Sequence, residues 1–590
     1  MLAAIAFLNA CSTPGDNKQG PETPTNEAQQ LETQHEYPLN LPPSKFHSEF
    51  NRAEQSLFEF NWMPAEAIIA TIPAEEISLM DQVYIHYIQA RILYVQGKQT
   101  DAQNILQALD LSTNQPAMRY KILSFQRYIY NLAGDSLNSA RVGDQLLQIT
   151  PEGPMAKSLT RYIWRDLQQF QASSVQRVIN ENSTPRWQSW LALSELGTHQ
   201  DSGADQLHAL TLWRSNNPDH PAAEELPGGM GFLLGAEPNP KKVALLLPLS
   251  GRLAPAAQAV RDGYLANYYA ARARDGFGTD VEVINLLDFD SVTQAYNSAV
   301  ENGAELVIGP LSKNAVEELG KLPGRTVPVL ALNRVDGSLP AAETALVQLA
   351  LAPEDEVEQI AKLAFGRGAR RALVIHPAGE WGDKMNAALG RQWQKLGGVV
   401  SSTATYSNRG SYSSSISSAL NLRTSEQRAN DIRRMLATKV ESTARRRQDV
   451  DVVFLLSKNA VEARSLKPLL AYHYASDLPV YATSNIYRGI TDPRDKDLEG
   501  IHLVETPWLL NKNLPIRQAM TAGGSGNFAY SRLNALGADA FLLQTRFAQL
   551  RAGQDMLIRG NTGLLTLTPE LHIKRQLQSA TFDGGNVTAQ

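Results

Sequence analysis

Polar residues at several strand-to-helix turns are the groups in this chain best placed to bind a ligand. Each follows an apolar run that is typical of a buried parallel strand. In open α/β sheets, ligands bind beyond the carboxyl ends of the strands, where helix N-termini attract negative charge. For any single residue the alternative is a helix cap, worth about 1 kcal/mol. Together they predict one cleft for an anionic or zwitterionic small molecule, lined by Ser250, Gly251, Pro310, Ser312, Asn333 and Ser457.

The chain lacks the motifs that would make such turns catalytic. It has no GxxxxGK[ST], no GxGxxG after a strand and no HExxH. Its single cysteine, Cys11, excludes a thiolate zinc cluster, and no serine is followed three residues later by lysine. The letters GDSL at 134–137 lie between two helical segments, where that hydrolase signature does not belong. We therefore expect a protein that is not an enzyme and holds no metal or cofactor.

The length and the net charge of the chain indicate how many domains it has and which partners it lacks. A chain of 590 residues predicts three or four structural units, at roughly 100–200 residues for each domain. The net charge of −5 lacks the basic footprint that sequence-independent nucleic-acid binding requires, so we expect no nucleic-acid partner. After the N-terminus, no apolar run reaches the roughly 18 residues that a membrane span needs.

The elements that must position the turns begin near residue 241. Apolar runs such as "KVALLLPLSG", "AELVIGPL" and "VDVVFLL" alternate with helical patterns, which predicts a doubly wound α/β fold. The alternation occurs twice, so we expect two lobes within 241–590. The first takes about 241–350 and part of 484–590, and the second takes much of 351–483. Residues 350–353 and 483–485 are the expected crossings between lobes.

A helical region precedes this α/β region. Residues 39–225 carry apolar residues at three- and four-residue spacing, with breaks at Gly97 and Gly134. The distance between these glycines is close to the tetratricopeptide period of roughly 34 residues. The pattern predicts a tetratricopeptide-like α-solenoid, with a helical bundle that lacks a true repeat as the alternative. Residues 226–240 are rich in Gly and Pro and are expected to form the linker.

The heptapeptide "LSKNAVE" occurs twice, at 311–317 and at 456–462. Each copy follows an apolar run, so we interpret it as the same turn in the two lobes, whether by duplication or by convergence. Asn314 with Glu317, and Asn459 with Glu462, have the spacing of an Asn cap followed by Glu at the third helical position.

A basic helical insertion at 412–449 interrupts the second lobe. It contains Arg433, Arg434, Arg445, Arg446 and Arg447. A solvated helix face would explain these charges, and a surface for an acidic partner is the functional alternative.

The chain begins with an apolar run, "MLAAIAFLNAC", that ends at Cys11. We expect residues 1–10 to be the end of a signal peptide that starts further upstream, and Cys11 to be lipidated; a stray buried cysteine is the alternative. More than one acyl chain would give stable anchoring. Residues 12–38 are rich in Pro, Gly, Gln, Thr and Glu and predict a disordered tether.

Several segments resemble known families. "KVALLLPLSGRLAPAAQAVRDGYLANYY", "LVIGPLSKNAVEEL" and "VPVLALNRVDG" resemble the type I periplasmic solute-binding fold. The order of lipidated cysteine, tether, helices and this domain, with "RRRQDVDVVFLLSKNAVEARSLKPLL", resembles the LpoA/LppC family. The resemblance implies an outer-membrane lipoprotein on the periplasmic side. It also implies that the protein binds and activates penicillin-binding protein 1A and so stimulates peptidoglycan synthesis.

A solute receptor is the competing interpretation, with an amino acid, peptide or cell-wall fragment bound between the lobes. A transport receptor would need neither the tether nor the helical region, which favours the activator. The two functions are compatible if a ligand in the cleft modulates activation.

Overall fold

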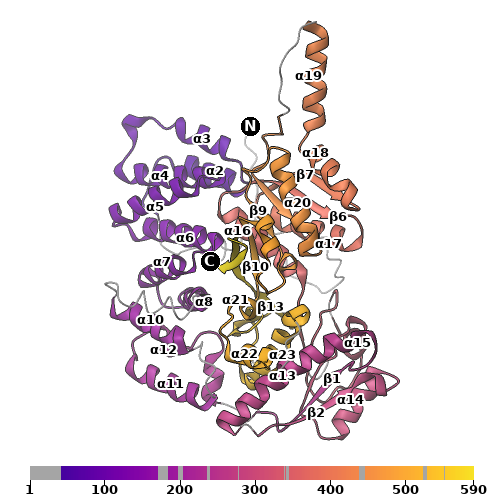
Figure 1. Ribbon diagram of the computed structural model, residues 1–590. Helices are drawn as coiled ribbons and strands as arrows, with labels where there is room; N and C mark the ends of the chain where they lie inside the picture. Colours follow the sequence, from indigo (N-terminus) through magenta and orange to yellow (C-terminus); the bar gives the residue numbers. More distant parts are fainter. Residues whose placement is uncertain are drawn as a thin grey trace, which may run out of the picture.

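The computed structural model describes residues 41–169, 184–196, 203–235, 239–276, 278–337, 339–340, 345–436, 445–522, 528–550 and 552–590. A stack of helices forms one side of the molecule, and two β-sheets with their covering helices form the other (Figure 1). The predictions made for 1–38, including lipidated Cys11, lie outside these residues.

The N-terminal helices form an array in which packing runs mainly between successive helices, as in a solenoid. Gly97 and Gly134 adopt positive φ angles of 85° and 78°, so the predicted breaks at both glycines are confirmed. The array consists of α2 (His47–Phe58), α3 (Trp62–Ala70), α4 (Leu79–Val95), α5 (Gln99–Ser112), α6 (Pro116–Ala133), α7 (Ser136–Ile149), α8 (Pro154–Gln168), α10 (Pro185–Leu196), α11 (Gly203–Asn216) and α12 (Pro221–Glu224).

The first lobe contains an eight-stranded sheet in the order β11-β12-β13-β5-β4-β3-β1-β2. Its strands are β1 (Lys242–Leu247), β2 (Asp280–Asn285), β3 (Leu306–Ile308), β4 (Val329–Ala331), β5 (Leu346–Leu349), β11 (Leu557–Arg559), β12 (Leu564–Leu567) and β13 (His572–Gln576). Its helices are α13 (Ala254–Asp275), α14 (Val292–Glu301), α15 (Lys313–Gly320), α23 (Ser531–Thr545) and α24 (Phe547–Leu550).

The second lobe contains a seven-stranded sheet in the order β15-β14-β10-β9-β8-β6-β7. Its strands are β6 (Arg371–Pro377), β7 (Val399–Tyr406), β8 (Val452–Leu455), β9 (Val480–Ala482), β10 (Ile501–Glu505), β14 (Gln578–Asp583) and β15 (Asn586–Ala589). Its helices are α16 (Pro353–Gly366), α17 (Glu380–Lys395), α18 (Tyr412–Ala419), α19 (Leu422–Leu436), α20 (Ala460–Tyr472), α21 (Pro507–Leu510) and α22 (Pro515–Ala522).

The two sheets share one topology. The parallel order β2-β1-β3-β4-β5 of the first lobe corresponds strand for strand to β7-β6-β8-β9-β10 of the second. One copy of the heptapeptide follows β3 and the other follows β8, which hold the same place in this order. The interpretation that the repeat marks equivalent turns in two lobes therefore agrees with the topology.

The chain crosses between the lobes three times, and only the first crossing lies where it was predicted. It crosses first between β5 and α16, at 350–352, as expected. Residues 483–485 do not cross, because β10 still pairs with β9 in the second sheet. The chain returns to the first lobe only between α22 and α23, and it crosses a last time at Leu577, between β13 and β14. The second lobe thus extends through α22 to Ala522 and also takes the last two strands.

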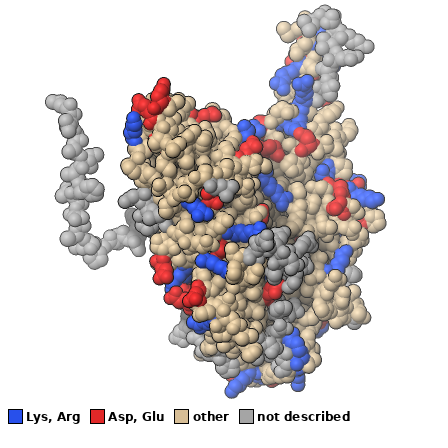
Figure 2. Space-filling model, turned by 90° about the vertical axis from the view of Figure 1, so that its left-hand side faces the viewer, with Lys and Arg blue, Asp and Glu red and all other residues tan. Residues whose placement is uncertain are grey.

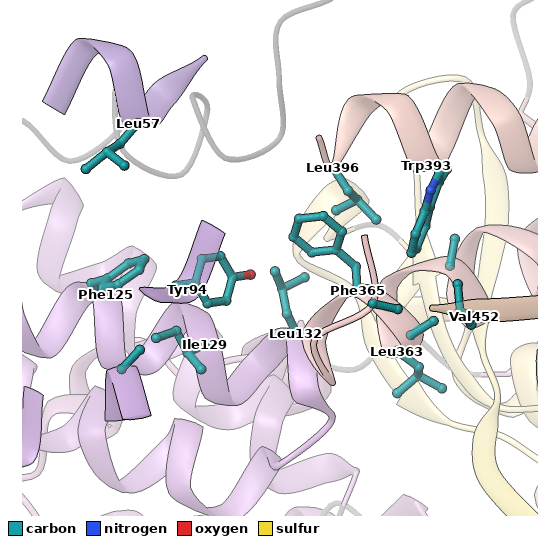
Figure 3. Packing of buried hydrophobic residues seen from close by; sticks show 14 of the residues in the cluster. Leu57, Tyr94, Phe125, Ile129, Leu132, Leu363, Phe365, Trp393, Leu396 and Val452 are labelled. Carbon is teal, nitrogen blue, oxygen red and sulfur yellow. The ribbon is translucent and has the colours of Figure 1, made fainter. Parts of the chain in front are cut away.

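The helical array packs against both lobes. Figure 3 shows Tyr94 and Leu132 of the array facing Phe365 of the second lobe within one apolar cluster. Arg370, just before β6, donates hydrogen bonds to the carbonyl oxygens of Tyr94 and Val95, the latter at 3.2 Å. A second cluster joins array helices to β11 and β12 of the first lobe. There Arg559 donates to the carbonyl oxygen of Gln168 at 2.9 Å.

Candidate functional site

Five of the six residues predicted to line a cleft lie in turns at the carboxyl edge of the first sheet, and these turns are joined in pairs. Asn285, the last residue of β2, accepts a hydrogen bond from the Leu249 backbone N–H at 2.9 Å and donates to the Ser250 hydroxyl at 3.3 Å. Asn333, after β4, donates to the Leu311 carbonyl oxygen at 2.8 Å. The structure therefore links the turns after β1 and β2, and those after β3 and β4. Asn285 was missed because it sits at the end of an apolar run without a motif.

The exposure of these turn residues varies. Ser250 and Gly251 are exposed, whereas Pro310 is buried. Ser312 and Asn333 are half-buried, and each already has a hydrogen bond within its own turn. Ser457 belongs to the other lobe and has no exposed surface. That these residues together hold a ligand stays a prediction.

The two copies of the heptapeptide start their helices at different residues. In the first copy Ser312 is the cap, because its hydroxyl accepts the Ala315 N–H, and the prediction that Asn314 caps this helix is wrong. In the second copy Asn459 accepts the Glu462 N–H at 3.0 Å, so that predicted cap is confirmed.

The strands that precede the copies explain this difference. Strand β3 ends at Ile308, three residues before the first copy, so the chain has already turned when the copy begins. Strand β8 ends at Leu455, immediately before the second copy, whose first residues therefore still leave the sheet. Helix α20 consequently begins two residues later within the repeat than α15 does.

Ion pairs connect the two lobes beside these turns. Arg334, after β4, contacts Asp355 of α16 through both terminal nitrogens, each 3.1 Å from the same carboxylate oxygen. Lys384 of α17 lies 2.5 Å from Glu354 and 3.7 Å from Asp336, which follows β4 in the first lobe. Burial alone would raise the pKa of Glu354, but the hydrogen bond from Lys384 lowers it below its usual range. The cluster therefore stays charged at neutral pH and holds the facing edges of the lobes together.

A buried polar network lies under the same boundary. Glu356 of α16 accepts hydrogen bonds from the backbone N–H and the hydroxyl of Ser484, at 2.9 and 3.1 Å. Burial raises the pKa of Glu356. Glu505, at the end of β10, has no exposed surface and pairs with Arg532 of α23. Breaking one partner of a buried pair is costly, because it leaves a charge without compensation. This network is therefore suited to fixing the lobes, and its carboxylates are not open to a substrate.

The arginines predicted as a partner surface fall into two groups. Arg433 and Arg434 lie near the end of α19, which projects beyond the second lobe, and basic side chains are visible on this arm (Figure 2). Arg446 instead pairs with Asp477, and Arg447 pairs with Asp449 at 2.6 Å. Arg445 is exposed, and its backbone N–H bonds the Ser425 hydroxyl. The structure thus gives the second group roles in holding the chain that leads into β8.

A cavity of about 720 Å³ lies away from the predicted cleft, between array helix α8, the segment after α12 and the turn near Asp555. Its walls carry paired charges, with Lys157 3.0 Å from Glu225 and Arg161 2.8 Å from Asp555. Sequence reasoning could not find this cavity, because it forms only where the array meets the first lobe.

The residues that the structure describes contain no group of three or more His, Cys, Asp or Glu side chains that could hold a metal ion. Within the same part of the chain, no helix is both long and apolar enough to cross a bilayer.

The class of protein follows from this arrangement. Two lobes share one parallel topology, three crossings connect them, and a helical solenoid precedes them. The class is a type I periplasmic-binding-protein-like domain joined to a tetratricopeptide-like array. The model of the family described as "LppC putative lipoprotein" matches residues 52–585, and the chain belongs to this family.

Relatives match along most of the chain. The penicillin-binding protein activator LpoA of Photobacterium profundum is 28% identical over 542 residues, covering 90% of this chain and 86% of the relative. The protein of the same name from Vibrio cholerae is 25% identical over 598 residues, covering 98% and 96%. The crystal structure of full-length LpoA from Haemophilus influenzae is 20% identical with a TM-score of 0.47, covering 95% of this chain and all of that one.

Proposed function

We propose that this protein is a regulator of peptidoglycan synthesis that binds and activates a penicillin-binding protein, specifically penicillin-binding protein 1A. The observation that carries the proposal is the extent of the family match, which includes the helical array and both lobes. Relatives named as penicillin-binding protein activators align over 90% and 98% of the chain. Those names describe activators, in agreement with the absence of catalytic motifs from the sequence.

The proposed mechanism is a population shift. An activator changes an enzyme's rate without making bonds itself if it binds the active conformation more tightly than the inactive one. The coupling is reciprocal for binding, so a substrate that favours the active synthase should tighten its binding to this protein.

We further propose that Cys11 is lipidated and that 12–38 tether the folded part to the outer membrane on its periplasmic side. The family's description as a lipoprotein supports an anchor. Replacing the thiol in Cys11→Ser should release the protein from the membrane fraction. A variant that stays with membranes to the same extent as the parent would contradict the anchor.

The direct test is a glycan polymerisation assay with purified penicillin-binding protein 1A, with and without the soluble protein that lacks 1–38. We expect a higher polymerisation rate and a measurable complex. An unchanged rate together with no detectable binding would contradict the proposed function.

A further inference from the structure

Helix α19, Leu422–Leu436, has few contacts with the rest of the described structure. It extends from the second lobe into solvent (Figure 1), and within the described chain it packs on α18 near its own start. Leu422 is buried at the base. Further out, Ile432 is 48% exposed and Met435 is 85% exposed. A helix of this length without tertiary contacts is only marginally stable in water, so an apolar face at this position calls for a partner.

The apolar residues of α19 form one stripe. Leu422, Ala429 and Ile432 are separated by seven and three positions, and Met435 follows three positions later. This is the spacing with which an amphipathic helix fits its apolar face into a groove of a partner. The flexible Met side chain suits such a contact, because it adapts to irregular surfaces.

The polar residues of α19 indicate the charge of that partner. The helix carries Arg423, Arg428, Arg433 and Arg434 but only Glu426 and Asp431 as acidic residues, whereas the whole chain is net negative. Locally positive charge on a projecting element favours an acidic surface and speeds its encounter. A membrane surface is the weaker match, since interfacial helices combine a basic face with aromatic anchors, and α19 has no aromatic residue.

We propose that α19 is a docking arm that inserts its apolar stripe into a groove on the activated synthase, and that acidic side chains border this groove. The inference rests on the proposed function and names the surface through which it acts. Arg446 and Arg447 are not part of this docking surface, because their ion pairs hold the chain that leads into β8.

The test compares negative charge placed on the stripe with negative charge placed on another exposed apolar site. The double variant Ile432→Asp/Met435→Asp puts two carboxylates on the stripe without touching a packed core. The control, Leu212→Asp, changes a helical Leu of the array that is 53% exposed. Circular dichroism and the midpoint of thermal unfolding establish that both variants fold like the parent.

We expect the double variant to bind purified penicillin-binding protein 1A at least ten-fold more weakly, as loss of central apolar anchors does, and to lose most of the stimulation. The control should match the parent. Arg428→Glu/Arg434→Glu should also bind more weakly, and the difference from the parent should shrink as salt is added.

Each other outcome overturns the proposal. If the parent binds and stimulates and the double variant does so equally, the arm is not the docking surface, although the proposed function stands. If the double variant binds anionic phospholipid vesicles more weakly than the parent but binds the synthase equally well, the arm docks on a membrane. If it raises hydrogen exchange along 422–436 with no effect on synthase binding, the stripe is covered by this chain's own residues. If the parent itself neither binds nor stimulates, the proposed function fails, and the docking arm fails with it.

Discussion

Adding one methyl group at Gly366 should separate the helical array from the second lobe. Gly366 ends α16, where it lies against the end of α6. A Cβ at this position would lie 2.0 Å from the carbonyl oxygen of Leu132 and 2.5 Å from the backbone nitrogen of Ala133. These are backbone atoms, so no side-chain rotation relieves the contact, and the two helices must move apart. The movement would open the apolar cluster around Phe365, which has no exposed surface.

The magnitude follows from two opposing effects. Overpacking a close-packed interior typically costs about 1–3 kcal/mol. Replacing Gly by Ala in a helix gains about 0.5–1 kcal/mol. The matched control is Gly390 of α17, where a Cβ meets nothing within 4 Å. We therefore expect Gly366→Ala to lower the free energy of unfolding by about 1–2 kcal/mol, and Gly390→Ala to raise it by about 0.5–1 kcal/mol.

Urea unfolding followed by tryptophan fluorescence measures both changes, because Trp393 of α17 packs against Phe365 with ring centroids 5.8 Å apart. Hydrogen exchange provides the local measurement. In Gly366→Ala, exchange should rise in 92–98, where Arg370 bonds the backbone of the array. Equal stability of the two variants, with unchanged exchange in that segment, would refute the close contact between α6 and α16.

Two further predictions concern helix caps and pH. Asn459→Ala should lower the free energy of unfolding by about 1 kcal/mol through loss of the α20 cap. Asn314→Ala should change it by less than about 0.5 kcal/mol, because Asn314 does not cap α15. Urea unfolding of both variants tests whether the two copies of the heptapeptide cap their helices with different residues. Burial, aided by the charge of Arg186, lowers the pKa of His220 to about 4, so the unfolded chain binds the proton first as pH falls below about 6.5. The free energy of unfolding that this group contributes should therefore be lost between pH 6.5 and 4, by about 2 kcal/mol after solvent screening. The variant His220→Asn keeps a side chain that can cap the Ala222 N–H. It should flatten this pH dependence in unfolding curves measured across the same range.

The alternation of strands and helices was predictable because buried parallel strands are continuous apolar runs with helices between them. Strand β5, Leu346–Leu349, was missed for a related reason. It lies in the apolar stretch "ALVQLALA", where a short run fits a strand or a helix equally well. The second crossing was wrongly predicted at 483–485 because strand β10 was not predicted. This strand pairs with β9 and so keeps the chain in the second sheet beyond these residues.

The contacts that connect lobes and array could not be predicted from the sequence. Lys384 and Asp336 lie far apart along the chain and meet only when α17 faces the turn after β4. Gly366 resembles an ordinary helix end, and its role appears only when the backbone of Leu132 lies against it. The split of the arginines had the same cause, because Asp477, the partner of Arg446, is supplied by the turn before β9.

The same contacts argue against a mechanism in which the lobes close on a solute. Such closure requires the lobes to move relative to each other, but here Arg334 pairs with Asp355 and buried Glu505 pairs with Arg532 across the boundary. The array adds a third constraint, because its early helices pack on the second lobe and its late helices on the first. Lobe movement would have to break a buried ion pair or bend the array. The α/β domain is therefore better suited to act as a rigid platform that presents α19 to a partner than as a hinged receptor.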